Sequence, residues 1–215
     1  MPRFLSLLAI VATCAVAPAA ASAPPSVAEI VARMEAARSG LNSYRVPVTM
    51  SGSVRNGLIS VHFTMKGTEY FKAPDRDALR MTQVPKIASG FKNTIVSIPP
   101  PAAWPEIYTM RVSGTQTYGS DRVFVLTGTP RKGGNVASVS MLVNASTYAL
   151  DAIAYAYKNG STLGFQLQHG GNSYRLPTGA AVSAHFPSYR GTANVVYGAY
   201  VTNVPIPESV FQTGQ

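Results

Sequence analysis

Hydrophobic and polar side chains alternate with a period of two between Leu58 and Arg76, the stretch around which the chain is organised. The apolar positions are Ile59, Val61, Phe63 and Met65. Successive side chains of a strand point to opposite faces, so this pattern predicts a long strand with one apolar face. Gly67 predicts a bulge or bend, and Pro74 is expected to end the pairing. A long, bent strand of this kind indicates a strongly curved sheet whose apolar face must be covered.

An amphipathic helix is predicted ahead of this strand, from Ser26 to Gly40. Ser26 and Glu29 have the spacing of a capping box, and Gly40 is a natural stop. The apolar residues that share one stripe at helical spacing are Val27, Ile30, Val31, Met34 and Leu41. We expect a helix of about four turns that lies across the sheet.

The remaining pattern predicts antiparallel strands joined by short turns. Asn56-Gly57 is a strong hairpin signal, so Tyr44–Met50 is expected to pair with the organising strand, and Leu79 and Met81 mark a third strand. Later strands are expected at 122–127, 136–144, 148–157, 163–167, 174–177, 181–186 and 193–203. Short strands at near-regular spacing predict a mainly β meander and not βαβ units.

The segment from Pro85 to Pro105 contains five prolines and the only tryptophan, Trp104. Proline cannot donate to a ladder, so this segment is not a central strand. Long segments without regular structure in compact domains are often functional. We interpret this one as a lid over the apolar face.

The N-terminal sequence has the pattern of an export signal. Arg3, the apolar run after it and Ala21-Ser22-Ala23 form a signal peptide pattern, with cleavage expected after Ala23. We expect residues 24–215 to form a single domain in the periplasm or outside the cell, without cysteine. Cys14 suggests a lipoprotein signal instead, although Thr13 fits that motif poorly.

The sequence contains no strong motif for catalysis or metal binding. His62, His169 and His185 lie in separate predicted strands, without ligand partners at metal-site spacing, so neither a metal nor a cofactor is expected. A secreted hydrolase remains an alternative hypothesis, and Asp75, Asp77 and Glu106 are its best carboxylates. Nothing near Asp75 and Asp77 in the sequence predicts the raised pKa that such chemistry needs.

The formal charge is +9, from 18 basic and 9 acidic residues, and the basic residues are scattered. Nucleic acid is not an expected partner for an exported protein of this pattern. Four basic side chains fall near the organising strand: Lys66, Lys72, Arg76 and Arg80. They predict either a solvated face or weak attraction to an anionic membrane surface.

Four stretches give the chain a resemblance to the periplasmic lipoprotein-carrier (LolA/LolB-like) superfamily. They are SYRVPVTM after the helix, YFKAPDR with the following LRM, VSMLVNASTYALDAIAYAYKNG, and the closing NVPIPESVF. The resemblance implies an unclosed, strongly curved antiparallel half-barrel, with an N-terminal helix and a lid over an apolar concave face. In the family an arginine precedes the proline that ends the bent strand and helps to hold the lid. Here Ala73 occupies that position, and Arg76 lies just beyond it.

The resemblance implies a non-enzymatic, monomeric carrier or binding protein for a lipid, an acyl chain or an acylated protein, with transient contact to a membrane or an inner-membrane donor. The alternative is a sensing or scaffold module of the same fold, of the kind that binds envelope-stress signals. The predicted ligand-facing residues are Val48, Met50, Ile59, Val61, Phe63, Met65, Leu79 and Met81, followed by Trp104, Tyr155, Tyr157 and Phe165. Alternation shows that these residues share a face, but it is equally compatible with a filled core and with a ligand cavity.

Overall fold

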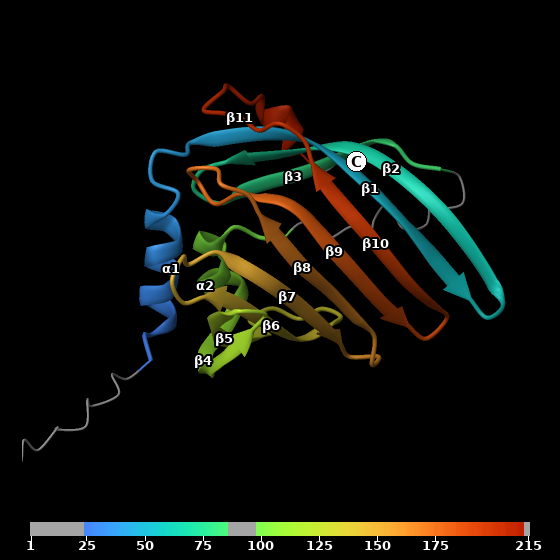
Figure 1. Cartoon of the computed structure of the whole chain (residues 1–215), viewed down its shortest axis with the longest axis horizontal. Coiled ribbons are helices and arrows are strands. Elements are labelled where there is room, and N and C mark those ends of the chain that lie inside the picture. The colour runs from blue at the N-terminus through green and yellow to red at the C-terminus, as the bar shows by residue number, and fades with distance from the viewer. Residues whose placement is uncertain (1–23, 86–97, 213–215) are drawn as a thin grey trace, which may run out of the picture.

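The computed structural model describes residues 24–85 and 98–212 (Figure 1). The predicted signal peptide, and residues 86–97 of the predicted lid, lie outside these ranges. The strands are β1 (Ser43–Asn56), β2 (Ile59–Lys72), β3 (Arg76–Gln83), β4 (Tyr108–Tyr118), β5 (Asp121–Pro130), β6 (Val136–Asn144), β7 (Leu150–Tyr157), β8 (Thr162–His169), β9 (Pro177–Phe186), β10 (Tyr189–Tyr197) and β11 (Val201–Thr202). The helices are α1 (Val27–Ala36), α2 (Trp104–Ile107) and two 3₁₀ turns at Pro101–Ala103 and Glu208–Val210.

The strands form one antiparallel sheet that is not closed into a barrel. Its order is β3-β2-β1-β10-β9-β8-β7-β6-β5-β4, and β11 pairs with β1. The strands β4 to β10 are a simple meander, and the β1–β3 unit joins this meander through β10. The strands β3 and β4 are therefore consecutive in the chain but lie at opposite edges of the sheet. The predicted half-barrel is confirmed.

The hairpin around the organising strand forms much as its pattern predicts. Met65 is buried between exposed Thr64 and Lys66, and the register of β2 against β3 shifts between Lys66 and Gly67, which is the predicted bulge. The two-residue turn is one position later than the Asn-Gly signal suggests, because Asn56 still pairs with Ile59. This leaves Gly57 and Leu58 at the tip of the hairpin.

Several boundaries differ from the sequence prediction, and contacts explain three of the differences. The helix ends at Ala36, and the chain reaches Gly40 through hydrogen-bonded turns, so α1 is shorter than expected. The segment 174–176 is a turn held by Asn172, whose side chain bonds the backbone of Leu176 twice, so no strand forms before Pro177. The predicted strand 193–203 is broken after Tyr197, where Gly198 donates its backbone N–H to Pro47 and the chain turns before β11.

Two apolar clusters line the concave face. The larger one joins Ile30 and Met34 of α1 and Trp104 of α2 to the inward side chains of β5–β8. The smaller one lies between β1, β2, β9 and β10 and includes Val46 and Met65. The helix begins with the predicted capping box, since Ser26 and Glu29 bond each other's backbone amides. Figure 1 shows α1 and α2 gathered at one end of the curved sheet and the β1–β2 hairpin projecting at the other.

Candidate functional site

A cavity of about 90 Å³ lies on the concave face between the two apolar clusters. The strands contribute one wall, and the segment Ile98–Trp104 contributes the other. The lining residues are Arg38, Tyr44, Val48, Met50, Glu69, Phe71, Asp77, Leu79, Ile98, Pro99, Pro100, Pro101, Trp104, Leu150, Phe165, Leu167, His169, Leu176, Pro177, Ala180, Val195 and Tyr197. Most of this surface is aliphatic or aromatic, which suits an apolar ligand.

The structure brings some of the predicted ligand-facing residues to this cavity and places the others elsewhere. Those that line it are Val48, Met50, Leu79, Trp104 and Phe165. Those in or against the two apolar clusters are Met65, Met81, Tyr155 and Tyr157. Phe63 packs against the smaller cluster and also lines a more open groove of about 590 Å³ between β1, β2, β8, β9 and β10. Val61 is half-buried on β2 nearer the hairpin tip, and Ile59 is 70% exposed at the tip itself.

Residues 98–105 of the predicted lid lie on the concave face, against the larger apolar cluster. Trp104 is fully buried, and its indole N–H donates a 2.8 Å hydrogen bond to the Pro99 carbonyl. Pro100 and Pro101 are buried beside it and face the cavity. The segment therefore makes one wall of the cavity and is anchored by Trp104 and by Arg131, whose Nε donates a 2.7 Å hydrogen bond to the Pro105 carbonyl.

One end of the cavity is polar. The Tyr44 hydroxyl donates a 2.6 Å hydrogen bond to Glu69, and burial raises the pKa of both groups. Burial, and then the charge of Asp75, raise the pKa of Asp77 to about 6. The sequence did not predict this shift, because the residues that bury Asp77 come from elsewhere in the chain. The positive charge of Arg38, just after α1, opposes the rise in the pKa of Glu69.

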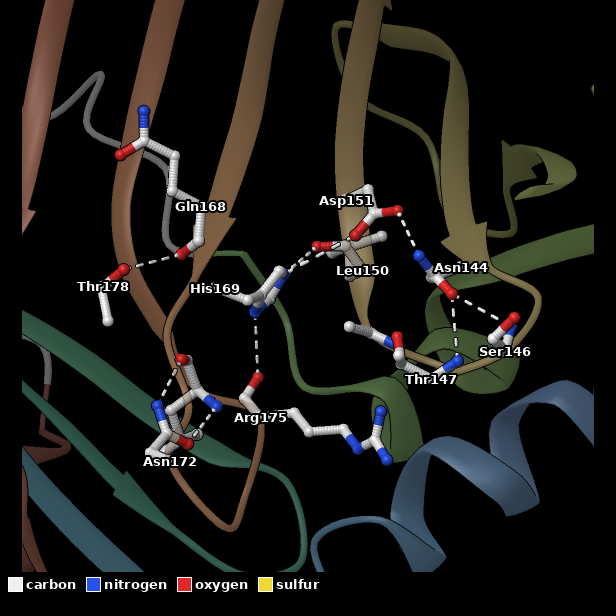
Figure 2. A network of polar contacts seen from close by, with 12 residues as sticks. Asn144, Ser146, Thr147, Leu150, Asp151, Gln168, His169, Asn172, Arg175 and Thr178 are labelled. Carbon is white, nitrogen blue, oxygen red and sulfur yellow. Dashed lines mark hydrogen bonds and ion pairs between the residues drawn. The ribbon is translucent and has the colours of Figure 1, made fainter. Parts of the chain in front are cut away.

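His169 connects the cavity wall to a second polar network, which Figure 2 shows. Its Nε2 lies 2.9 Å from the Leu150 carbonyl, and its Nδ1 lies 3.1 Å from the Arg175 carbonyl. Asp151 Oδ1 lies 3.9 Å from His169 Nε2, and Asp151 Oδ2 accepts a hydrogen bond from the Asn144 side chain. The Asn144 side-chain oxygen in turn accepts from two backbone amides of the turn before β7. Burial raises the pKa of Asp151, and the Asn144 hydrogen bond opposes that rise. The network fixes the 170–176 loop against β7.

The basic residues near the organising strand hold the C-terminal segment. Lys72 and Arg76 both pair with Glu208, and the Arg76 guanidinium lies 4.9 Å from the centre of the Phe211 ring. Arg80 donates to the carbonyls of Val210 and Gln212. Three of the four residues of the predicted basic patch therefore also hold the C-terminal segment, and the side chains of Lys72 and Arg76 stay partly exposed there. The attraction of this patch to an anionic membrane stays a prediction. Arg76 also does not replace the lid-holding arginine of the family, because its partners are in the C-terminal segment.

The three carboxylates of the hydrolase hypothesis do not gather at the cavity. Asp77 lines the cavity, whereas Asp75 and Glu106 are exposed and do not. Within residues 24–85 and 98–212, no group of histidine, cysteine and carboxylate side chains has the arrangement of a metal site. In the same ranges no helix has both the length and the apolarity needed to cross a bilayer.

Comparison with known proteins shows the fold. No protein-family model and no curated protein sequence matches the chain. A DUF1329 family protein from Desulfovibrio piger has a TM-score of 0.62 at 12% identity, over 86% of this chain and 95% of that one. A putative outer membrane lipoprotein-sorting protein domain from Vibrio parahaemolyticus has a TM-score of 0.60 at 13% identity, with the same two coverages.

A LolA superfamily protein from Nitrosomonas europaea has a TM-score of 0.55 at 11% identity, over 88% of this chain and 99% of that one. The fold is LolA-type. The predicted resemblance is confirmed at this level.

Sequence reasoning missed the polar end of the cavity, although one signal was present. Glu69 has the same parity as Met65 and Phe71, both of which are buried on the concave face. A carboxylate at an inward position of an alternating strand is unusual, because a buried charge is costly without a partner. His169 has the parity of Phe165 and Leu167, which line the same cavity, so it gave a similar signal. Arg38 gave none, because it lies in a turn.

Proposed function

We propose that this protein is an exported, non-enzymatic carrier or binding protein for a lipid, an acyl chain or the acyl groups of a lipoprotein. The ligand's hydrocarbon lies along the concave face, between Val48, Leu79 and Phe165 of the sheet and the segment 98–104. The observation that carries this proposal is an apolar cavity whose one wall is a short proline-rich segment and not a strand. Export to the periplasm is part of the proposal.

The cavity volume sets a condition on binding. A dry cavity of about 150 Å³ holds one benzene, so about 90 Å³ cannot hold an acyl chain as it stands. A ligand must displace the segment 98–104, which no strand pairing holds in place. Each methylene gains roughly 0.8 kcal/mol on leaving water, and a membrane offers the same gain, so exchange between membrane and protein is near balance.

The polar end gives the ligand an orientation. Tyr44, Glu69 and Asp77 face the cavity together with Arg38, whereas the opposite wall is aliphatic and aromatic. A headgroup with hydrogen-bond donors fits beside the two carboxyl groups, and the hydrocarbon fits toward Phe165 and Trp104. The ligand is therefore an amphiphile and not a plain hydrocarbon.

Trp104 supplies the test, because it is the only tryptophan and it lines the cavity. Brominated fatty acid quenches tryptophan on contact, so we expect it to quench Trp104, whereas the unbrominated acid does not. Ala180→Phe fills the cavity and is expected to abolish the quenching, whereas Ala154→Phe, on an exposed position of β7, leaves it unchanged. Absence of quenching, together with absence of co-purified lipid in mass spectra, would refute the proposal.

The sensing or scaffold module stays as a second candidate because the cavity is small. A protein that binds its partner through the outer surface or an open sheet edge needs no internal ligand. Such a protein would show no quenching, and its partner would still be recovered after delipidation.

A further inference from the structure

One rim of the sheet is formed by the turns between strands on the side away from α1. These turns are Arg55–Ile59, Arg131–Asn135, Lys158–Ser161 and Pro187–Arg190, and we call them together the turn rim. Pairing aligns them, since Asn56 is opposite Ile59, Arg55 opposite Arg190, and Tyr189 opposite Phe186. Figure 1 shows the β1–β2 and β9–β10 turns along this edge, with the β1–β2 turn reaching farthest.

The tip of the β1–β2 turn is apolar and exposed to solvent. Leu58 is 96% exposed and Ile59 is 70% exposed, and they are the two most exposed of the large hydrophobic residues in the described ranges. The other two, Val196 and Val201, are separated from them and from each other in the sequence. Isolated exposed apolar residues are ordinary, but two adjacent ones at the end of a projecting hairpin form a hydrophobic tip. Beside it, the rings of Phe186 and Tyr189 stack at 4.7 Å.

The charge of the turn rim is entirely positive. Its exposed basic residues are Arg55, Arg131, Lys132, Lys158 and Arg190, and none of its residues is acidic. Acidic side chains lie mainly at the opposite end, on α1 and around Glu69, Asp77 and Glu208. Tyr108 pairs with Pro130, so Glu106, just before β4, is the acidic residue nearest to the turn rim.

Arg55 and Arg190 form a like-charged pair on the turn rim. They are directly opposite each other in the β1–β10 pair, and like charges so placed repel. His185 is opposite Arg190 on the other side, and Ser60 is opposite Arg55, so no carboxylate neighbours this pair across the sheet. An anionic surface that contacts both guanidinium groups removes the repulsion.

We propose that the turn rim docks this protein on an anionic lipid bilayer. Leu58 and Ile59 enter the interface between headgroups and acyl chains, and the five cations contact lipid phosphates around them. Apolar residues that enter an interface, with cations at headgroup level, are the two signals that reversible membrane binding combines. This inference does not depend on the proposed function, because it concerns the outside of the molecule and not the cavity.

Flotation of the purified protein with vesicles tests the proposal. Binding is expected with phosphatidylcholine vesicles that contain phosphatidylglycerol, to be roughly fivefold weaker for each arginine removed in Arg55→Gln/Arg190→Gln, and to weaken with salt. Leu58→Ser/Ile59→Ser is expected to lower the partition coefficient by at least about tenfold. These positions are exposed, so both variants should keep the wild-type circular dichroism spectrum and melting temperature.

Two control variants match these changes elsewhere on the surface. Arg45→Gln/Arg122→Gln removes the same charge from exposed positions away from the turn rim, and Val196→Ser/Val201→Ser removes exposed apolar groups. Neither should change binding by more than about twofold, since only contacts at the interface contribute. Equal losses in the tip and control variants, or failure of the wild-type protein to bind anionic vesicles, would overturn the proposal. Quenching of Trp104 by brominated fatty acid in the tip variants reports the cavity separately.

Discussion

The Tyr44 hydroxyl donates a 2.6 Å hydrogen bond to the Glu69 carboxylate and thereby links β1 to β2 inside the apolar concave face. The Tyr44 ring also stacks on Phe71 at 5.3 Å and meets Tyr200 edge-on at 5.2 Å. A half-buried carboxylate therefore has its donor held in place by aromatic packing. This pair defines where the cavity changes from apolar to polar.

Tyr44→Phe is expected to destabilise the protein by about 1–3 kcal/mol, because it removes the donor to a buried acceptor and keeps the ring. Tyr197→Phe is the matched control, since Tyr197 lines the same cavity and makes no hydrogen bond through its hydroxyl in the described ranges. Urea denaturation of the three proteins measures the difference. Equal stabilities of the two variants would mean that the Tyr44–Glu69 bond contributes nothing.

Asp77 is expected to make stability fall as the pH rises. Its pKa is about 6 in the folded protein against an ordinary value of 3.8, so between these values the folded state binds more protons than the unfolded state. Raising the pH through this window therefore favours unfolding, and the loss is complete above it. Asp77→Asn should melt higher than wild type at a pH of about 8 and should differ little from it at about 3.

Differential scanning calorimetry across this pH range checks that prediction, and Glu106→Gln provides the control at an exposed carboxylate. The comparison uses the difference between wild type and variant at each pH, so shifts at other acidic groups cancel. A difference between wild type and Asp77→Asn that does not grow with pH would contradict the expected ionisation of Asp77.

Asn203 fastens the C-terminal segment to the start of β1. Its side chain accepts from the Asn42 amide at 2.8 Å and donates to the Gly40 carbonyl at 2.9 Å, and its φ is 55°. Asn203→Gly keeps this backbone conformation without the two bonds, whereas Asn203→Ala loses the bonds and strains the backbone. We expect losses of about 1–2 kcal/mol for glycine and about 1 kcal/mol more for alanine. Chemical denaturation that ranks alanine as equal to glycine would exclude the backbone contribution.

Gly52 allows β1 and β10 to approach each other closely. A Cβ at this position would lie 2.2 Å from the Thr192 carbonyl oxygen and 2.7 Å from Ala193 Cα, which are backbone atoms. Gly52→Ala is therefore expected to cost about 1–3 kcal/mol through overpacking. At Gly133 a Cβ meets nothing within 4 Å, so Gly133→Ala is the neutral control. Thermal melts that show no difference between the two would contradict the close approach.

Local patterns in the sequence predicted the sheet well because its strands have one apolar face. The alternation in β2, the boundaries of β6 and the capping box at Ser26 all involve residues near one another in the chain. The errors arose where distant partners decide the local structure. Gly198 ends β10 by donating to Pro47, and the Asn172 amide converts 174–176 into a turn.

The candidate site was less accessible to such reasoning. Parity placed Val48, Met50 and Phe165 on the correct face, but it cannot distinguish a filled core from a cavity, and Met65 and Tyr155 lie in filled regions. The role of Lys72 and Arg76 depends on Glu208, more than 130 residues later. Long-range ion pairs leave no periodic signal, so the sequence did not predict that these two cations hold the C-terminal segment.

The pairing of β1 with β10 constrains how the molecule is made. Synthesis delivers the N-terminal end first, so β1, β2 and β3 are made well before β10. Until β10 is made, the edge of β1 that pairs with it has no partner strand, and its backbone donors and acceptors stay exposed to water. Completion of the sheet therefore waits for β10, which lies close to the C-terminal end of the chain, so the proposed export would favour an unfolded chain over a folded one.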